Sequence, residues 1–474
     1  MPNKKSNMSE IYIYNTLSHK KEVFKPLKDK KVLLYTCGPT VYWFAHIGNL
    51  RSYIFSDVLA RVFRYNGYKV KHVMNITDVD DKTIKGTIKE YGKKAKKEEL
   101  RKFAQKYIKV FKEDIRKLNF QKELAFVRAT NVVEEIKTAV KKLIKKNFAY
   151  IKEGSAYFDI RKYNQKFNDY GILAGKDFLK GLKLGKVISV DEYQKENIGD
   201  FVLWKKFKKG EDANIFWTDP ILGKGRPGWH IECSVISMEY LGKSIDIHNG
   251  GVDLIFPHHS NEIAQSQALS NKVPFVRYWL HAEHMLINNE KMAKSKNNFY
   301  TLRDIEKRFD PPAYRYLCLG SHYRSKMNFS WESLESGQNA LKNLYQKTLE
   351  LKKNGKAKRI GPKAKHYKDQ FTKLINEDLN TPKALGEVWK MLDDKDISDK
   401  EKYALLIDFD KVLGLSLDKV KKEKIPTEVL KLVEQRERLR KQKEWKKSDQ
   451  VRRKIQDKGF QVEDTKKGPE IRPL

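Results

Sequence analysis

The chain has few cysteines and no long hydrophobic segment. Its 474 residues include three cysteines, Cys37, Cys233 and Cys318, which are too few for a disulfide framework and are better interpreted as thiols or metal ligands. No apolar stretch approaches the roughly 20 residues that span a bilayer. The N-terminal MPNKKSNMSE also lacks the apolar core of a secretion signal. We therefore expect a cytoplasmic protein with no membrane partner.

Acidic residues are in deficit as well. Lysine and arginine number 97 against 61 aspartates and glutamates, which gives a formal net charge of +36. Such an excess favours a polyanionic partner, and nucleic acid is the obvious class. Lysine is spread along the whole chain, however, as a coding bias alone would produce. Residues 421–474 differ from this background. They include 18 Lys and Arg and 10 Asp and Glu, so their net positive charge per residue is about twice the average of the chain.

Hydrophobic patterning near the N-terminus predicts a βαβ unit. Residues 31–37 (KVLLYTC) form an apolar run that a Gly-Pro pair ends, as in a buried strand. Residues 50–67 have apolar positions three and four apart, as on one face of a helix, and close on a glycine. Residues 68–77 predict a second strand. A strand, a helix and a strand at this spacing predict a parallel sheet.

The remaining sequence suggests further domains, since a chain of this length exceeds one compact core. Charged helical patterns fill 82–150, a mixed pattern in 151–225 indicates an insertion, and 226–300 returns to short apolar segments. Beyond Thr301 the pattern is helical nearly to Leu415. Two segments are candidate linkers, 359–365 and 423–427.

One glycine pattern invites a dinucleotide-binding interpretation that we reject. Residues 223–228 (GKGRPG) fit G-x-G-x-x-G. A dinucleotide site needs a strand before this loop and a helix from its last glycine. Here Pro220 interrupts the preceding segment and Pro227 lies within the loop, so the pattern does not indicate such a site.

A second turn has a more specific arrangement. His46-Ile47-Gly48-Asn49 lies between the first predicted strand and the predicted helix, where helix N–H groups and the helix dipole attract an anion. A histidine there can donate a hydrogen bond to a phosphate oxygen, and Gly48 lets a ligand approach the backbone closely. Taken alone, the turn is equally compatible with an ordinary βα loop.

Two lysines form another candidate phosphate site. Lys291 and Lys294, within KMAKS, lie three residues apart on a polar loop and could clamp a triphosphate as it gains charge in a transition state. In so lysine-rich a chain, this spacing alone is weak evidence.

Residues from three parts of the chain form a candidate metal set. Cys37 ends the first predicted strand, and Cys233 lies in GRPGWHIECS. A proline is well placed to begin a helix that carries His258 and Glu262. Residues four apart share a helix face, so these two side chains can converge on one ion.

Spacing leaves two alternatives open in this set. His259 and Glu262, three residues apart, can also share an ion, and spacing alone does not choose between the two histidines. Two buried structural cysteines are the plain alternative to a metal site. Cys318 lies within an apolar run without such neighbours, and we expect it in the core.

Taken together, these segments resemble one family. The turn at 46–49 and the loop at 291–295 are similar to the HIGH and KMSKS signatures of class I aminoacyl-tRNA synthetases, and the flanking segments resemble the cysteinyl-tRNA synthetase family in particular. The similarity spans nearly the whole chain in the right order. The segments that carry it are YTCGPTVY at 35–42, NITDVDDK at 75–82, FVLWK at 201–205, GRPGWHIECS at 225–234, GGVDLIFPHHSNEIAQS at 250–266, HYRS at 322–325 and LNTPKAL at 379–385.

The resemblance implies an α/β fold. A Rossmann-like parallel-sheet catalytic domain would contain an insertion and would be followed by a helical-bundle domain and a small C-terminal anticodon-binding domain. The implied ranges are 1–120 for the first half of the catalytic domain, 121–225 for the connective insertion, 226–300 for its second half, 301–358 for a stem-contact region, 366–420 for the helical bundle and 425–474 for the anticodon-binding domain.

The resemblance also implies roles for single residues. One Zn²⁺ per chain would be bound by residues matching Cys37, Cys233, His258 and Glu262, which selects between the two histidines. The substrate pocket would include Thr77 and Trp229. The implied catalytic residues are His46, Asn49, Lys291 and Lys294, and the implied ATP contacts are His46, Asn49, Gly250, Gly251, Asp253 and Lys294.

The implied reaction joins cysteine to tRNA(Cys). Cysteine and ATP, with Mg²⁺, would give cysteinyl-adenylate and pyrophosphate, and the acyl group would move to the 3′ end of the tRNA; the family suggests a monomer. Zinc fits this task because a pocket that selects by size separates cysteine from serine only about 10–200-fold, whereas a soft metal binds a thiolate directly. Since the ligands carry about −3 in total, we expect the ion to select substrate rather than to activate water.

The sequence departs from the family pattern at several positions. Asn49 replaces the second histidine of HIGH and keeps a hydrogen-bond donor without the charge, and Ala293 replaces the first serine of KMSKS. Asn249 and Asn297 stand where glycine is usual, and asparagine tolerates left-handed backbone better than most residues. We expect these changes to affect rate more than function.

Two other functions remain as alternatives. A homologous cysteine ligase could pass the adenylate to a small amino-sugar acceptor, but such enzymes lack the basic terminal domain that 425–474 resembles. A catalytically dead RNA-binding paralogue would not be expected to retain the metal set, His46 and both loop lysines.

Overall fold

The computed structural model describes residues 10–175, 183–184, 197–292, 298–421, 426–465 and 468–473. The chain divides into two compact units, Met1–Leu417 and Asp418–Leu474. The division falls a few residues before the linker expected at 423–427, part of which lies outside the described residues. In the described part of the chain, no helix is long and apolar enough to cross a membrane.

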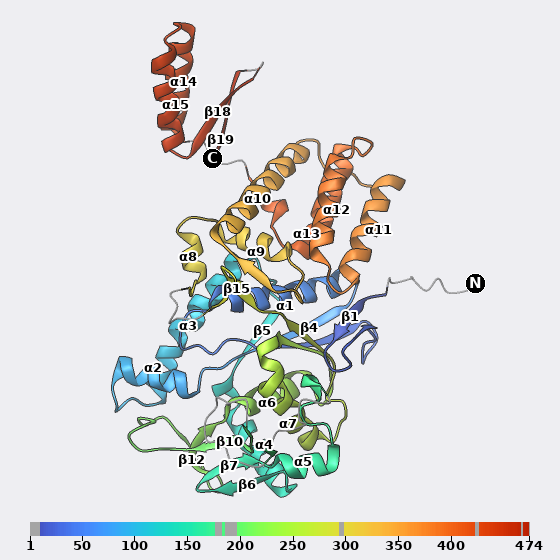
Figure 1. The fold of residues 1–474 in the computed structure, drawn as a ribbon, viewed down its shortest axis with the longest axis vertical. Helices are drawn as coiled ribbons and strands as arrows, with labels where there is room; N and C mark the ends of the chain where they lie inside the picture. The colour runs from blue at the N-terminus through green and yellow to red at the C-terminus, as the bar shows by residue number, and fades with distance from the viewer. Residues whose placement is uncertain are drawn as a thin grey trace, which may run out of the picture. The chain divides into compact units, whose positions relative to one another are not determined.

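A five-stranded parallel sheet forms the centre of the first unit (Figure 1). Every neighbouring pair in it is parallel, which confirms the predicted βαβ unit and the α/β class. The helix of that unit is α1 (Ile47–Tyr65). In spatial order the strands are β14 (Val276–Ala282), β13 (Ile245–Gly251), β3 (Lys31–Thr36), β4 (Lys69–Ile76) and β5 (Leu124–Arg128).

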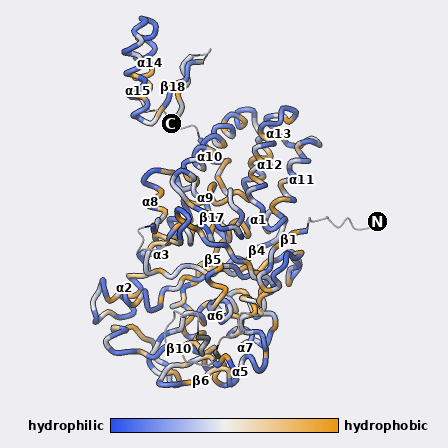
Figure 2. Tube along the Cα trace, viewed as in Figure 1, coloured by the Kyte–Doolittle hydropathy of each residue, from blue (hydrophilic) through white to orange (hydrophobic). Residues whose placement is uncertain are grey.

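Both faces of this sheet are covered, as is typical of parallel sheets. Leu34 points into the core that α1 helps to form, and its neighbour Tyr35 points into a second core formed with helices on the other face. Those helices are α4 (Val133–Lys145), α6 (Trp229–Leu241) and α7 (Ser260–Ser270). In Figure 2 the trace of α6 includes hydrophobic stretches, in keeping with its place in this core.

The strand β5 corrects one expected boundary. It pairs in parallel with β4, so the sheet continues beyond residue 120, where the first half of the catalytic domain was expected to end. Only Val127 of its five residues is buried, and its short apolar run, 124–127 (LAFV), lies inside a region whose pattern is otherwise that of charged helices. Between β4 and β5 the chain forms α2 (Asp81–Tyr91) and α3 (Lys97–Lys117), in agreement with the predicted charged helices.

A second sheet, antiparallel, lies within the expected insertion. Its order is β11-β12-β10-β7-β6, and its last strand in sequence ends two residues beyond the expected boundary at 225. The strands are β6 (Ala149–Lys152), β7 (Ser155–Phe158), β10 (Phe201–Lys206), β11 (Trp217–Asp219) and β12 (Gly223–Pro227). The rejected glycine pattern therefore forms a strand and the cap of α6 instead of a phosphate loop.

Shorter elements complete the first half of this unit. They are the hairpin β1 (Tyr12–Asn15) and β2 (Lys20–Val23), α5 (Ile160–Phe167), the pair β8 (Lys183–Leu184) and β9 (Asn197–Ile198), the 3₁₀ turns η1 (Ala129–Val132), η2 (Ile172–Ala174) and η3 (Val252–Leu254), and the π turn η4 (Ile255–His259).

The remainder of the unit is largely helical, as predicted beyond Thr301. A small sheet of three short strands precedes and interrupts the helices: β15 (Met285–Ile287), β16 (Glu290–Lys291) and β17 (Met327–Phe329). The helices are α8 (Leu302–Glu306), α9 (Pro311–Leu319), α10 (Trp331–Lys352), α11 (Pro362–Asn376), α12 (Thr381–Asp393) and α13 (Asp399–Leu413), followed by the turn η6 (Leu417–Lys419).

The second unit has its own small core. Two helices and a hairpin, α14 (Thr427–Lys441), α15 (Trp445–Asp457), β18 (Phe460–Thr465) and β19 (Gly468–Pro473), surround Val429, Val433, Val451, Ile455 and Val462. In Figure 2 both helices are mainly hydrophilic, consistent with the charge counted in this segment.

Candidate metal centre and active site

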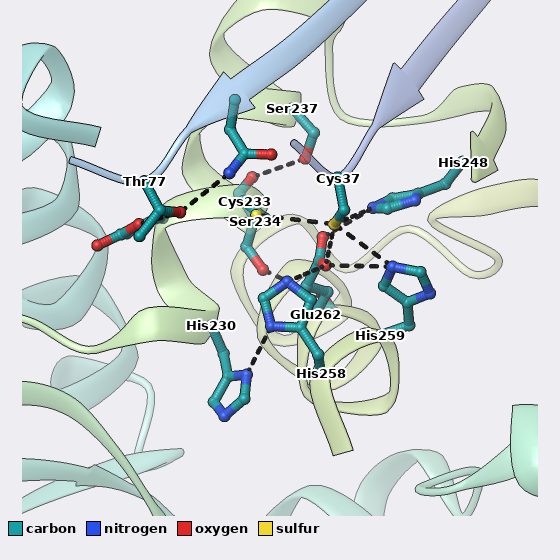
Figure 3. A network of polar contacts seen from close by, with 12 residues as sticks. Cys37, Thr77, His230, Cys233, Ser234, Ser237, His248, His258, His259 and Glu262 are labelled. Carbon is teal, nitrogen blue, oxygen red and sulfur yellow. Dashed lines mark hydrogen bonds and ion pairs between the residues drawn. The ribbon is translucent and has the colours of Figure 1, made fainter. Parts of the chain in front are cut away.

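The four predicted metal ligands lie together (Figure 3). Cys37 follows β3 directly, Cys233 lies on α6, His258 in the π turn η4 and Glu262 on α7. One ligand atom from each lies within 4.8 Å of the others, and all four side chains are buried. The elements that carry them all adjoin the carboxyl edge of the parallel sheet, where open α/β sheets bind their ligands.

The spacing of these atoms suits a tetrahedral metal ion. The Sγ atoms of Cys37 and Cys233 are 3.9 Å apart, and Cys37 Sγ is 3.5 Å from Glu262 Oε1. Tetrahedral zinc with Zn–S bonds of about 2.3 Å and Zn–O bonds of about 2.1 Å would separate these pairs by about 3.8 and 3.6 Å. Two thiols, an imidazole and a carboxylate are also a donor set that zinc accepts. The residues present therefore fit this metal.

Charge separation within the set favours a cation. Burial alone would raise the pKa of Glu262, but His248 and His258 outweigh it and lower that pKa to about 2. Burial likewise opposes the charged form of His258, yet Glu262 and Cys233 raise its pKa to about 10. The hydrogen bond from Cys37 and the charge of His258 lower the pKa of Cys233 to about 6 despite burial. Burial and the neighbouring Cys233 raise the pKa of Cys37 well above its ordinary value. Positive charge at His258 thus favours the charged forms of Glu262 and Cys233, and a bound cation would act in the same direction.

His259, the alternative left open by spacing, belongs to a neighbouring group. His258 Nε2 lies 3.1 Å from Glu262 Oε1, whereas His259 Nε2 lies 4.0 Å from it. His259 is instead 2.8 Å from His281 through its Nδ1 and 3.4 Å from Cys37 Sγ. Together with His248, it forms a second possible ligand set that shares Cys37 and Glu262 with the first.

Three histidines that sequence reasoning did not select surround this site. His248 Nε2 lies 2.9 Å from Glu262 Oε2, and His230 and His258 approach within 2.8 Å through their Nδ1 atoms. His281 contacts His259 from β14. His248 and His281 both lie near the carboxyl end of a strand, which could have marked them as candidates. The pairing of those two strands, which brings the histidines together, was not predictable from the sequence.

The two expected substrate-binding residues flank the metal set. Trp229 stacks on the His258 ring at 4.4 Å between centroids. The hydroxyl of Thr77 donates to Glu232 Oε2 at 3.1 Å. Glu232, which sequence reasoning also missed, is fully buried, and its Oε1 has no hydrogen-bond partner in the described structure. An unpaired buried oxygen is costly, and so it marks a place for a polar ligand atom.

The turn at His46 caps α1 as expected of an anion-binding helix end. His46 is the N-cap residue, and its Nδ1 accepts a hydrogen bond from the Asn49 N–H at 3.2 Å. A Cβ on Gly48 would lie 3.0 Å from the His46 ring, which explains the glycine. The first turn of α1 contains no acidic side chain that would repel an anion.

The segment after the lysine loop packs against this turn. The Ile47 N–H donates to the Tyr300 carbonyl at 2.9 Å, and the rings of His46 and Phe299 are 5.1 Å apart. The two signature regions are thus joined on the C-terminal side of the loop. Lys294, Ala293 and Asn297 lie outside the described residues, and for Lys291 only its place at the end of β16 is described.

The expected adenosine-binding stretch follows β13. Gly250 and Gly251 end that strand, and Asp253 lies in η3. A Cβ on Gly250 would come within 2.9 Å of the His259 ring, so glycine is required there for close packing. Asn249 lies inside β13 and has no left-handed backbone, so it does not need the tolerance expected of asparagine there. Its side chain accepts from Thr36 and donates to Ser56.

Cys318 is buried in the core formed with α1, as expected. It lines none of the ligand sets found among the described residues.

Known proteins similar to this chain point to one family. Residues 23–339 match the family described as tRNA synthetases class I (C) catalytic domain. A cysteine–tRNA ligase of Chlamydia muridarum is 42% identical over 490 residues, covering 98% of this chain and 100% of that protein. The cysteine–tRNA ligase of Leptospira interrogans is 42% identical over 480 residues, covering 97% and 99%.

Solved structures show the same fold at low sequence identity. Mycobacterium tuberculosis methionyl-tRNA synthetase, in complex with methionyl-adenylate, superimposes with a TM-score of 0.56 at 14% identity, covering 81% of this chain and 90% of that one. The leucyl-tRNA synthetase of Agrobacterium radiobacter K84, in a ternary complex, gives a TM-score of 0.59 at 11% identity, covering 83% and 85%. The match to a class I catalytic domain and the relatives that agree along almost their whole length show that this chain belongs to the cysteine–tRNA ligase family.

Proposed function

We propose that this protein activates cysteine with ATP and transfers it to the 3′ end of tRNA(Cys). The observation that carries the proposal is the buried set of Cys37, Cys233, His258 and Glu262 at the carboxyl edge of the parallel sheet. The capped N-terminus of α1 lies at the same edge, because α1 follows β3 as Cys37 does. A thiol-binding set and an anion-binding helix end on one sheet edge are what a cysteine-activating enzyme needs.

Zinc is the proposed resident metal, held by Cys37, Cys233, His258 and Glu262. When bound, Zn²⁺ would supply a soft acceptor for the substrate thiolate, a position that the hydroxyl of serine fills poorly. The protein holds these ligands rigidly through buried neighbours, since His230 contacts His258 and His248 contacts Glu262. Such outer contacts fix ring orientation and tautomer in metal sites.

Thr77, Trp229 and Glu232 are proposed to bind the rest of the amino acid. The Trp229 ring covers His258 and closes one side of the site. One carboxyl oxygen of Glu232 accepts from Thr77, and the other has no hydrogen-bond partner among the described residues, which suits a cationic ammonium group. A buried pair of this kind would keep water away from the carboxylate of the bound cysteine, which must attack ATP in the next step.

Adenylate formation then requires positioning and charge stabilisation without a protein nucleophile. The cysteine carboxylate attacks the α-phosphorus of ATP, and pyrophosphate leaves. We assign phosphate contacts to His46, Asn49, Lys291 and Lys294, and adenosine contacts to Gly250, Gly251 and Asp253. Mg²⁺ would accompany the triphosphate. In the second step a ribose hydroxyl of the terminal tRNA nucleotide attacks the adenylate carbonyl, and AMP leaves.

We assign residues 301–358 to contacts with the tRNA stem and the basic residues 425–474 to its anticodon. The expected setting is a cytoplasmic monomer.

Three measurements on purified protein test the function. Metal analysis should find one zinc per chain, cysteine-dependent exchange between ATP and pyrophosphate should occur without RNA, and purified tRNA(Cys) should be charged. Absence of exchange would leave only an RNA-binding paralogue. Exchange without charging would favour a ligase for a small amino-sugar acceptor.

A further inference from the structure

A cavity lies on the edge of the sheet that also carries the metal centre. It has a volume of about 450 Å³ and is lined by residues of α3, of β11 and of the segments that follow β4 and β5. Because parallel strands end at one edge, residues after β4 and β5 lie on the side where Cys37 follows β3. Proteins bind small ligands in cavities of about 300–1,000 Å³.

The cavity is positively charged. Lys97, Arg101 and Arg128 line it, and Asp78 is the one carboxylate among its lining residues. Asp78 already accepts two hydrogen bonds from Thr130, at 2.9 Å from the N–H and 2.6 Å from the hydroxyl. Three cations and one carboxylate leave a net charge of +2, which favours an anionic ligand.

These cations are not committed to other charges. Within the described parts of the chain, no ion pair includes Lys97, Arg101 or Arg128; the last donates a hydrogen bond to the neutral amide of Gln105. In a protein with so many lysines, most exposed cations face only solvent. Here, three converge on a cavity, and this convergence distinguishes them from the general charge excess.

An aromatic ring completes the cavity. Trp217, on β11 of the insertion, is half-buried and lines the wall, with Lys97 Nζ 5.4 Å from its ring centroid. Cations that follow a phosphate backbone, combined with an aromatic surface for a base, are the means by which proteins bind single-stranded nucleic acid. A cavity of this size holds a nucleotide and is too small for a base-paired helix.

We propose that this cavity holds one nucleotide of the single-stranded 3′ end of the tRNA, with its phosphate against Arg101 and Arg128 and its base or sugar against Trp217. The proposal rests on the proposed function, because only a tRNA substrate brings an RNA end to this edge of the sheet. It also gives a role to part of the charged region 82–150, which the metal centre and the ATP site leave unexplained.

The first test compares Arg101→Ala with Lys145→Ala, an exposed charge on α4 that is remote from the cavity lining. Arg101→Ala should raise the KM for tRNA about tenfold and reduce the slope of log affinity against log salt by about one. Lys145→Ala should do neither. Cysteine-dependent exchange without RNA should stay within about twofold of the parent for both variants.

The second test removes the RNA end. The parent protein should bind tRNA lacking its single-stranded 3′ nucleotides as weakly as Arg101→Ala binds intact tRNA, and Arg101→Ala should lose nothing further on truncation. Equal losses with intact and truncated tRNA would place the contact elsewhere and overturn the proposal, as would an unchanged KM. Lack of exchange by the parent protein would instead reject the proposed function.

The contribution of the Trp217 ring is tested separately. Trp217→Ala should weaken binding of intact tRNA about tenfold, while Trp217→Phe, which keeps an aromatic surface, should recover most of it. If the alanine variant fails to fold, the phenylalanine variant and Arg101→Ala still decide the outcome. Loss of affinity for intact and truncated tRNA alike in Trp217→Phe would contradict a stacking role.

Discussion

The imidazole of His258 and the carboxylate of Glu262, four residues apart, meet at 3.1 Å between Nε2 and Oε1. The two residues lie in different elements, since His258 is in the π turn η4 and Glu262 in the helix α7 that continues from it. The junction directs both side chains toward Cys37 and Cys233, where they complete a donor set with two sulfur atoms.

Replacing one sulfur ligand should remove the metal and cysteine activation together. We expect Cys233→Ser to retain little zinc and to lose cysteine-dependent exchange by about 100-fold or more, since removal even of outer contacts of a metal site costs about 10–100-fold. Zinc analysis and exchange kinetics measure the two effects. Cys318→Ser, a change at a buried thiol outside the site, is the control. Normal cysteine affinity in zinc-free Cys233→Ser would show that the metal does not select the substrate.

The contact between His230 and His258 should influence metal affinity without contributing a ligand. We expect His230→Ala to weaken zinc binding about 10–100-fold, because the 2.8 Å contact that orients His258 is lost. Competition with a chromophoric chelator measures the affinity. His366→Ala, on the exposed face of α11, should have no effect. Unaltered zinc affinity in His230→Ala would mean that packing alone fixes the His258 ring.

Lys294 is expected to act on the transition state. Lys294→Ala should reduce the rate of adenylate formation about 100-fold or more, with a much smaller change in cysteine binding, because a lysine that meets developing charge contributes little to the ground state. Single-turnover formation of the adenylate, measured over a range of cysteine concentrations, separates the rate of the chemical step from the affinity for cysteine. Lys296→Ala offers a neighbouring lysine for comparison. Equal losses in rate and cysteine binding would count against this role.

Gly48 should influence ATP binding, because it leaves room for the ring of His46. An added Cβ would lie 3.0 Å from that ring, and so Gly48→Ala should displace His46 and raise the KM for ATP in exchange, by about tenfold. Gly386→Ala is a matched control, because a Cβ there meets nothing within 4 Å and alanine favours the interior of α12. An ATP KM equal to the parent's would indicate that the turn tolerates the shift.

The buried ion pairs of Asp57 should make stability depend on pH. Burial opposes its charge, but Arg61 at 2.6 Å and Arg315 at 2.7 Å outweigh this and lower the pKa of Asp57. A carboxyl with a lowered pKa stabilises the fold fully above its unfolded pKa of about 4, and this contribution disappears as pH falls below that value.

Asp57→Asn should therefore reduce the free energy of unfolding at pH 7 by about 3 kcal/mol, since it leaves two buried guanidinium groups without their partner. The difference from the parent should narrow below about pH 4. Urea unfolding at several pH values measures both. Asp369→Asn, at an exposed ion pair, should change the free energy of unfolding by less than about 0.5 kcal/mol. A difference in the free energy of unfolding that is constant with pH would show that the ionised carboxylate of Asp57 is not the source of the stabilisation.

The sequence predicted those features that depend on local pattern. The strand ending at Thr36, the helix α1 and the strand β4 follow from apolar spacing, and the i, i+4 relation of His258 and Glu262 follows from helix geometry. Resemblance to a family was needed to associate them with Cys37 and Cys233, which lie 196 residues apart. No periodicity links residues at such a distance.

Features that depend on tertiary pairing were not predicted. The strand β5 has one buried residue, and the order of the strands, not their sequences, places His248 and His281 beside the metal set. Glu232 was missed for a similar reason. It lies in a signature segment next to Cys233, but its buried and partly unpaired carboxyl is evident only when Thr77 is seen opposite it.

The distance in sequence between the ligands has a consequence for biosynthesis. Glu262 follows Cys37 by 225 residues, and the insertion lies between them. A ribosome must therefore complete the insertion and begin the helix α7 before the fourth donor exists, and no shorter nascent chain can assemble the full centre. Metal loading is then a late step of folding, and an ion held by these four residues would cross-link the first strand–helix unit to segments made long after it.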